Sequence, residues 1–254
     1  MLKRAGVTTY RLFREGGVKQ VYSYARLRWL VLTKAHKSQV RLDGCRFSLQ
    51  GISDKSTIVE LVTGNYEAGE RRAIARYLRR DLPVVELGGS MGVVACVTNK
   101  LLQNRKAHLV VEANPLAIPH LELNRALNAC KFEIVNQAIA YGSETVTFRP
   151  SSSMCGNSIT EDGDQPPVTV QTAQLGELTR NRGFSRFNLV CDIEGVEYDL
   201  VCQEPEVLKN ADTLIMETHA RFIGEEKYSL MMSKLADLGF KTLEETGFVI
   251  VLRR

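Results

Sequence analysis

The sequence lacks closely spaced pairs of metal ligands. Its six cysteines form no Cys-x-x-Cys pair, and its four histidines form no His-x-x-x-His pair. Such pairs are the usual sequence sign of a zinc site. We therefore expect reduced, mostly structural thiols and no zinc site.

Long apolar runs are also missing. No stretch approaches the roughly 20 consecutive apolar residues that a spanning helix needs, and the N-terminus has no signal-type hydrophobic segment. Internal repeats and low-complexity tracts are absent as well. We therefore expect a cytoplasmic protein. Its 254 residues, 44% of them hydrophobic, suit one large domain with an appendage.

Positive charge is concentrated at one end of the chain. Residues 1–46 hold eleven Lys or Arg and two acids, a net of +9, and the whole chain carries +4, which leaves −5 for the remainder. Apolar residues at helical spacing predict a basic helix over residues 18–37. Such a helix can lie on an anionic membrane or follow nucleic acid, but more often it docks on its own domain. We therefore do not expect a nucleic-acid partner from this feature alone. Peripheral membrane contact through the helix stays open.

Short elements precede the main domain. Residues 41–50 alternate in polarity around Asp-Gly, which predicts a strand or hairpin that caps the core. An Arg-rich helix is predicted over residues 69–80, because it must stop before Pro83. We therefore divide the chain into a basic helical segment with its cap, residues 1–65, and a ligand-binding domain, residues 66–254.

From residue 84 onwards, strand and helix patterns alternate. Alternation predicts an α/β fold with a mostly parallel sheet, and two strands at the end add an antiparallel hairpin. This architecture is typical of Rossmann-like methyltransferases rather than of dehydrogenases. Residues 140–148 predict a further hairpin, and the polar stretch 149–167 is long enough to be functional or mobile. The predicted strands cover residues 84–87, 108–113, 133–139, 187–193, 212–218, 240–244 and 247–253, with helices over 93–103, 115–129, 175–182 and 225–238 and another after Tyr198.

A glycine-rich turn follows the first strand of this series. The sequence VVELGGSMG places Glu86 before Gly88, Gly89, Ser90 and Gly92. It differs from the Gly-x-Gly-x-x-Gly turn, which holds a pyrophosphate. An acid before the first glycine suits a cationic ligand, and S-adenosylmethionine carries an amino group and a sulfonium but no phosphate. A tight turn without a ligand is the alternative.

A second acid, Glu112, ends the next strand, twenty positions after Gly92. A carboxylate there can accept both hydroxyl groups of a ribose. Ala113 and Asn114 follow, and Asn114 is the better candidate to cap the helix predicted from residue 115. Glu112 is then available for the cofactor.

The third predicted strand carries an amide near the ligand edge. Gln137, followed by Ala138, can hydrogen-bond an adenine edge there. A surface turn without a ligand explains these residues nearly as well.

Acidic residues gather after the fourth and fifth strands. Asp192 ends the fourth strand, where ligands bind in parallel sheets, so we expect it to act as a general base or a metal ligand. Glu194 and Glu197 fit this site and the start of a helix about equally. Glu217 and His219 lie two apart on one face of the fifth strand, and a neutral imidazole there can accept a hydroxyl proton. A hydrogen-bonded structural histidine is the alternative.

These motifs, in this order, resemble the FkbM family of S-adenosylmethionine-dependent methyltransferases from about Tyr66 to the C-terminus. The shared segments are Tyr66-Glu67, VVELGGSMG, VVEANP, NQAIA, Asn157-Ser158-Ile159, DIEGVE and IMETH. Departures from the family pattern are Glu for Asp at Glu86, Val190 where Lys is common, and Gly176 where Asp is usual.

The resemblance implies a class I methyltransferase fold and O-methylation of a hydroxyl on a sugar, glycolipid or polyketide-like product. Carried over by position, the glycine turn holds the methionine part and Glu112 the ribose. Gln137 and Ala138 lie near the adenine, and Asp192 lies near the methyl group and acceptor. Tyr66 and Glu67 help to close the methionine end.

The sequence therefore predicts an S-adenosylmethionine-dependent O-methyltransferase acting on a sugar, glycoconjugate or related natural product. Asp192 is the first candidate base, His219 the second, and Glu217 supports them. A divalent cation such as Mg²⁺ at Asp192 and a homo-oligomeric state stay open. The alternatives are an RNA or protein methyltransferase that uses the basic N-terminus, and a non-catalytic binding protein on the same scaffold.

Overall fold

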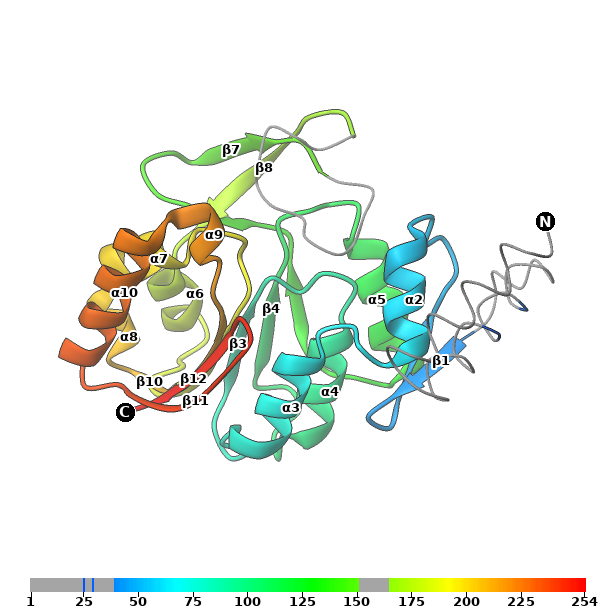
Figure 1. The fold of residues 1–254 in the computed structure, drawn as a ribbon, viewed down its shortest axis with the longest axis horizontal. Helices are drawn as coiled ribbons and strands as arrows, with labels where there is room; N and C mark the ends of the chain where they lie inside the picture. The colour runs from blue at the N-terminus through cyan, green and yellow to red at the C-terminus, as the bar shows by residue number, and fades with distance from the viewer. Residues whose placement is uncertain (1–24, 26–28, 30–38, 151–164) are drawn as a thin grey trace, which may run out of the picture.

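The computed structural model describes residues 25, 29, 39–150 and 165–254 (Figure 1). Ala25 and Trp29 are helical, and the rest of the predicted basic helix lies outside the described residues. The Asn157-Ser158-Ile159 motif and most of the polar stretch also lie outside them. None of the described helices has the length and hydrophobicity that crossing a bilayer requires.

A seven-stranded sheet forms the centre of the fold, in the spatial order β11-β12-β10-β9-β3-β4-β5. β12 runs antiparallel to both of its neighbours, whereas the strands from β10 to β5 are parallel. The strands are β3 (Val84–Leu87), β4 (His108–Val111), β5 (Glu133–Val135), β9 (Phe187–Cys191), β10 (Ala211–Glu217), β11 (Lys241–Thr246) and β12 (Val249–Arg253).

This order confirms the predicted fold. A dinucleotide-binding sheet has six parallel strands, whereas here the last strand of the chain inserts antiparallel between β10 and β11. The result is the class I methyltransferase sheet, mostly parallel with an antiparallel C-terminal hairpin.

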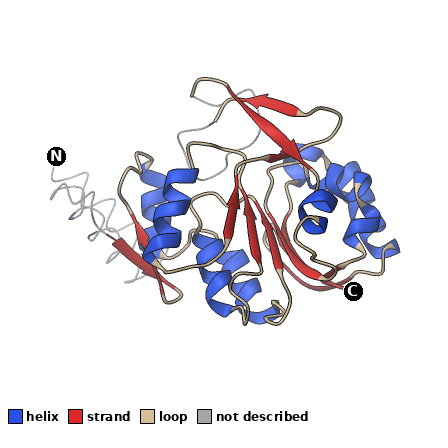
Figure 2. Ribbon diagram, turned by 180° about the vertical axis from the view of Figure 1, so that it is seen from behind, coloured by secondary structure: helices blue, strands red, loops and turns tan. Residues whose placement is uncertain are grey.

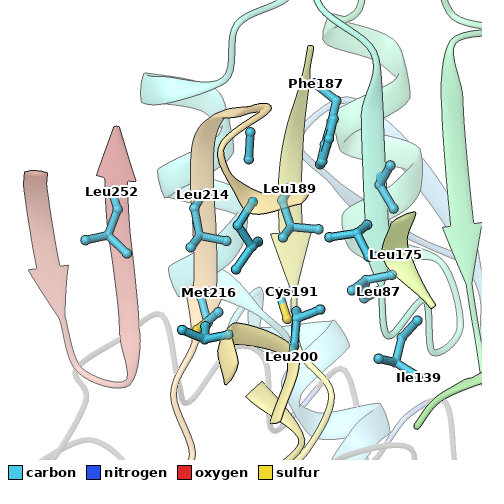
Figure 3. Close-up of a cluster of buried hydrophobic side chains, with 14 of the residues drawn as sticks. Leu87, Ile139, Leu175, Phe187, Leu189, Cys191, Leu200, Leu214, Met216 and Leu252 are labelled. Carbon is cyan, nitrogen blue, oxygen red and sulfur yellow. The ribbon is translucent and has the colours of Figure 1, made fainter. Parts of the chain in front are cut away.

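Helices cover both faces of the sheet (Figures 1 and 2). β3, β4 and β9 are buried at every position, which explains their continuous apolar runs. Figure 3 shows Leu87, Leu189, Leu214 and Leu252 along neighbouring strands in one buried cluster. Helices α6 (Leu175–Arg180), α7 (Glu197–Gln203), α8 (Pro205–Leu208), α9 (Ala220–Ile223) and α10 (Glu225–Asp237) lie on that side, and α3 (Ala68–Tyr77), α4 (Val93–Leu101) and α5 (Ile118–Leu127) on the other.

A small cap precedes α3. Strands β1 (Gln39–Leu42) and β2 (Cys45–Ser48) form the expected hairpin, whose turn residues Asp43 and Gly44 have φ of 46° and 77°. It docks on α5, because the Asn124 Oδ1 accepts a hydrogen bond from the Ser48 N–H at 3.0 Å.

Helix α2 (Lys55–Thr63) was not among the predicted elements. Its signals are present in the sequence, because Asp54 accepts hydrogen bonds from the N–H groups of Ser56 and Thr57, and Gly64 ends the helix at φ 82°. The helix has only nine residues, so periodicity alone did not separate it from a loop.

Two predictions about the middle of the chain were wrong. The strand expected over residues 133–139 ends at Val135, because Asn136 turns away and its Nδ2 donates to the carbonyls of Glu112 and Ala113. The hairpin expected within residues 140–148 does not form. Instead a second sheet, in the order β6-β8-β7, consists of β6 (Ala138–Ile139), β7 (Thr145–Phe148) and β8 (Val168–Ala173).

A close backbone contact joins β3 to β9. Gly88 has φ +88°, and a Cβ there would lie 1.7 Å from the carbonyl oxygen of Asp192. We expect Gly88→Ala to lower the free energy of unfolding by about 1–3 kcal/mol more than Gly183→Ala. Gly183 is a matched control, because it also has positive φ (+67°) but open space around its Cβ position. Urea denaturation measures both, and equal losses would contradict this contact.

Candidate active site

The glycine turn connects β3 to α4 at the carboxyl edge of the sheet. The N–H groups of Gly88 and Gly89 donate to the Val111 carbonyl, at 2.9 and 3.1 Å. A Cβ at Gly89 would lie 2.4 Å from Val110, and one at Gly92 would lie 2.5 Å from Leu121. Packing therefore requires these glycines even without a ligand, so they are weaker signs of a cofactor than the sequence pattern implies.

Glu112 holds the two loops of the site together. Its Oε2 accepts the N–H of Ser90 and its Oε1 accepts the N–H of Asn114, both at 2.6 Å. Burial raises the pKa of Glu112, whereas these backbone donors favour its charged form. The N–H groups of Ala113 and Gly89 also favour the charged form, so backbone donors surround this carboxylate beside the glycine turn.

The turn that follows Glu112 differs from the predicted helix cap. The Asn114 Oδ1 accepts the N–H of Leu116, and α5 begins at Ile118 with Ala117 as its N-cap. The prediction that Asn114 caps this helix was therefore wrong. A separate turn precedes α5, and Pro119 in the first turn of the helix favours this later start.

The predicted adenine residues are engaged by the second sheet. The Gln137 Nε2 donates to the Thr172 carbonyl at 3.4 Å, which directs the amide towards β8. Ala138 is 1% exposed and packs with Phe148 and Val170. The methyl group of Ala138 therefore offers almost no surface to a ligand in this conformation.

Tyr66 contacts the glycine turn, and Glu67 follows it at the start of α3. The Tyr66 hydroxyl is 2.9 Å from the Ser90 Oγ, and the ring is buried. Glu67 has φ 47° at the start of α3. Burial, then the charges of Glu70, Glu86 and Glu217, raise its pKa, while a hydrogen bond with Tyr66 lowers it.

Glu86 is fully enclosed beneath this turn. It is 1% exposed, and its Oε2 lies 3.4 Å from the His108 Nε2. Burial raises the pKa of Glu86, and His108 partly offsets that shift. Neither carboxylate oxygen accepts a hydrogen bond from another residue that the structure describes. A buried carboxylate in this state is costly unless a donor, such as an ammonium group or water, reaches it.

The three predicted catalytic residues come together at the ends of β9 and β10. The His219 Nε2 lies 3.7 Å from the Asp192 Oδ1 and 3.9 Å from the Glu217 Oε1. It is closer still, 3.2 Å, to the Glu194 Oε2. His219 itself is only 3% exposed.

Glu197 fixes the orientation of His219. The Glu197 Oε1 lies 2.8 Å from the His219 Nδ1, and the carboxylate also accepts the N–H groups of Ile193 and Gly195. Because Glu197 is fully buried and held by the backbone, the imidazole must present Nε2 to the acids opposite. From sequence alone, Glu197 cannot be distinguished from an ordinary acid at the start of a helix.

Several carboxylates face one another at this edge of the sheet. Burial and the charge of Glu194 raise the pKa of Asp192 well above its usual range. Burial and a hydrogen bond with Glu70 raise the pKa of Glu217 to about 10. Glu70 is 5% exposed and was not predicted, because its place in the first turn of α3 resembles an ordinary helix acid. We refer to Glu67, Glu70, Asp192, Glu194 and Glu217 as the acidic edge.

The contact between Tyr66 and Ser90 can be tested directly. Tyr66→Phe removes a buried hydroxyl that is paired with the Ser90 Oγ. We expect it to lower the free energy of unfolding by about 1 kcal/mol. Tyr228→Phe is the control, because that half-buried ring packs against the core by apolar contact. Equal stability of the two variants in urea denaturation would argue against the bond.

Comparisons with known proteins gave structural matches only. No family model matches the chain, and no curated protein matches it. Among solved structures it is similar to the ribosomal protein L11 methylase of Lactobacillus delbrueckii subsp. bulgaricus, at 16% identity and a TM-score of 0.42, covering 74% of this chain and 77% of that one. It is also similar to Aeropyrum pernix fibrillarin with bound S-adenosyl-L-methionine, at 12% identity and a TM-score of 0.44, covering 73% and 74%. A putative O-methyltransferase from Klebsiella pneumoniae matches at 11% identity and a TM-score of 0.43, covering 73% and 78%.

Proposed function

We propose that the protein is an S-adenosylmethionine-dependent O-methyltransferase. The observation that carries this proposal is the joint placement of Glu112 and the acidic edge on either side of the glycine turn. One end of the site offers a carboxylate for a ribose. The other end offers negative charge for a cation.

The ribose end is formed by Glu112. Its oxygens are fixed by the N–H groups of Ser90 and Asn114, so the carboxylate is positioned before any ligand arrives. A carboxylate at the end of the second strand of such a sheet is in the position to accept the vicinal hydroxyl groups of a ribose. Asn136 adds rigidity, because it hydrogen-bonds the carbonyl of Glu112 at 2.7 Å.

The charge of the other end distinguishes among nucleotide cofactors. The charges that act most strongly on Glu67 and Asp192 belong to other carboxylates. Because burial and these neighbours raise the pKa of Glu67 and Asp192, a bound ammonium or sulfonium would favour the charged carboxylates, whereas a pyrophosphate would find no cation to pair with there. S-adenosylmethionine combines the required ribose, ammonium and sulfonium.

The chemistry that follows is methyl transfer to an oxygen. A lone pair of the acceptor hydroxyl forms the new O–C bond, the methyl–sulfur bond breaks, and S-adenosylhomocysteine leaves with that electron pair. The hydroxyl proton passes to Asp192 or His219. The main contribution of the protein is to align the hydroxyl with the methyl group and sulfur and to exclude water. The family resemblance supports a sugar, glycoconjugate or related natural product as acceptor.

Cofactor binding is the first test. We expect calorimetric titration with S-adenosylhomocysteine to give micromolar affinity, and Glu112→Ala to weaken it at least tenfold because the ribose loses its acceptor. Glu122→Ala is the control, because it removes an exposed acid from α5 and should leave the affinity unchanged.

Two outcomes would contradict the cofactor assignment. The wild-type protein would fail to bind S-adenosylhomocysteine, or it would bind a dinucleotide such as NAD⁺ more tightly. Either result would favour the alternative of a non-catalytic binding protein on the same scaffold.

Turnover is the second test. With methyl-labelled cofactor we expect transfer to sugar or glycoconjugate hydroxyls, and we expect Asp192→Asn to reduce it at least a hundredfold while cofactor affinity changes only a few-fold. Asp237→Asn, at an exposed position on α10, is the control. Transfer to RNA or protein instead would overturn the acceptor class, and unchanged turnover in Asp192→Asn would overturn the role of that residue.

A further inference from the structure

Three side chains at the acidic edge have the arrangement of metal ligands. One oxygen each from Asp192 and Glu194 and one nitrogen from His219 all lie within 4.8 Å of one another. The acids follow β9 and the histidine follows β10. These strands are hydrogen-bonded in parallel register up to the pair Met216 and Cys191, so the rigid sheet fixes the ligand spacing.

The imidazole is prepared for coordination through Nε2. Its Nδ1 lies 2.8 Å from Glu197, which is itself held by the N–H groups of Ile193 and Gly195. A metal-bound histidine almost always donates its other ring N–H to a carboxylate or carbonyl in this manner. Glu197 therefore occupies the position of a second-layer partner that sets the tautomer and the ring orientation.

One of the opposing oxygens, on Asp192, lacks a donor among the described residues. The Asp192 Oδ1 is inaccessible to water and accepts no hydrogen bond within the described part of the chain. Three carboxylate oxygens, from Asp192, Glu194 and Glu217, lie within 3.9 Å of the His219 Nε2. One N–H group can point at only one of them. A cation at this point can be coordinated by more than one of these groups, because the ligand atoms of Asp192, Glu194 and His219 lie close together.

We propose that Asp192, Glu194 and His219 bind a divalent transition-metal ion, with Glu197 as the positioning residue for His219. Two carboxylates and an imidazole favour ions such as Mn²⁺ over Mg²⁺ or Ca²⁺, which prefer oxygen ligands alone. Three protein ligands leave coordination positions open. If the proposed function holds, those positions are where an acceptor hydroxyl would bind, and the ion would lower the pKa of that hydroxyl.

The test uses the full chain, freed of metal by chelation and titrated with MnCl₂ alone. Electron paramagnetic resonance of free Mn²⁺ should show one saturable site per chain. Asp192→Asn, Glu194→Gln and His219→Ala should each weaken binding at least tenfold, and Glu197→Gln by about 10–100-fold. Glu225→Gln, at an exposed acid at the start of α10, should leave the affinity unchanged.

A spectroscopic readout separates coordination from general electrostatic attraction. Bound Mn²⁺ should show the electron spin-echo modulation of a coordinated ¹⁴N, and His219→Ala should remove it. Absence of a saturable site, or absence of the ¹⁴N modulation in the wild-type protein, would overturn the proposal. Asp192→Asn checks the same site where His219→Ala fails to fold, because Asp192 is partly exposed and its Oδ1 accepts no hydrogen bond from the described residues.

Failure of this inference is distinct from failure of the proposed function. Mn²⁺ binding is measured without cofactor, and S-adenosylhomocysteine binding is measured without metal. Cofactor binding with no Mn²⁺ site would overturn the metal inference alone. A Mn²⁺ site with the ¹⁴N signal in a protein that binds no S-adenosylhomocysteine would support the metal and overturn the proposed cofactor.

Discussion

The close approach of Gly88 to the Asp192 carbonyl is the contact on which the site depends. A side chain at residue 88 would occupy the position of that carbonyl, so the end of β3 meets the end of β9 only because residue 88 is glycine. The Asp192 N–H also donates to Leu87 at 2.9 Å. This contact brings the glycine turn and Asp192 together, although they lie about a hundred residues apart in the sequence.

Buried acids fall into two groups here, and the difference separates architecture from ligand binding. Glu112 and Glu197 accept backbone N–H groups, so their burial is compensated within the protein. Glu86 has buried oxygens, and Asp192 a buried Oδ1, that receive no hydrogen bond from the described residues. Unpaired buried carboxylates destabilise a fold unless a cationic ligand binds them. Glu112 and Glu197 therefore stabilise the architecture of the site. Glu86 and Asp192 are the acids whose burial a ligand would compensate.

The sequence predicted the parts of the structure that follow from local pattern. Fully buried parallel strands give apolar runs, and an acid at the end of such a run lies at the ligand edge, which is how Glu112 and Asp192 were found. Glu70 and Glu197 were undervalued, because their roles arise from contacts with residues far away in the sequence. β8 alternates in polarity, but its partner β7 lies across a long connection, so no hairpin signal joined the two.

The two roles available to Asp192 and His219 constrain each other. A lone pair that coordinates a metal ion does not accept a proton, so one complex cannot use the same atom both ways. With the ion bound through the Asp192 Oδ1 and the His219 Nε2, the nearest remaining carboxylate is Glu217, whose Oε1 lies 3.9 Å from that nitrogen. Burial and a hydrogen bond with Glu70 raise the pKa of Glu217 to about 10, so it keeps its own proton near neutral pH and is a poor acceptor. Without the ion, Asp192 is the acid with an unpaired oxygen and is the better base. In the proposed reaction, the identity of the proton acceptor therefore depends on whether Asp192, Glu194 and His219 hold a metal ion.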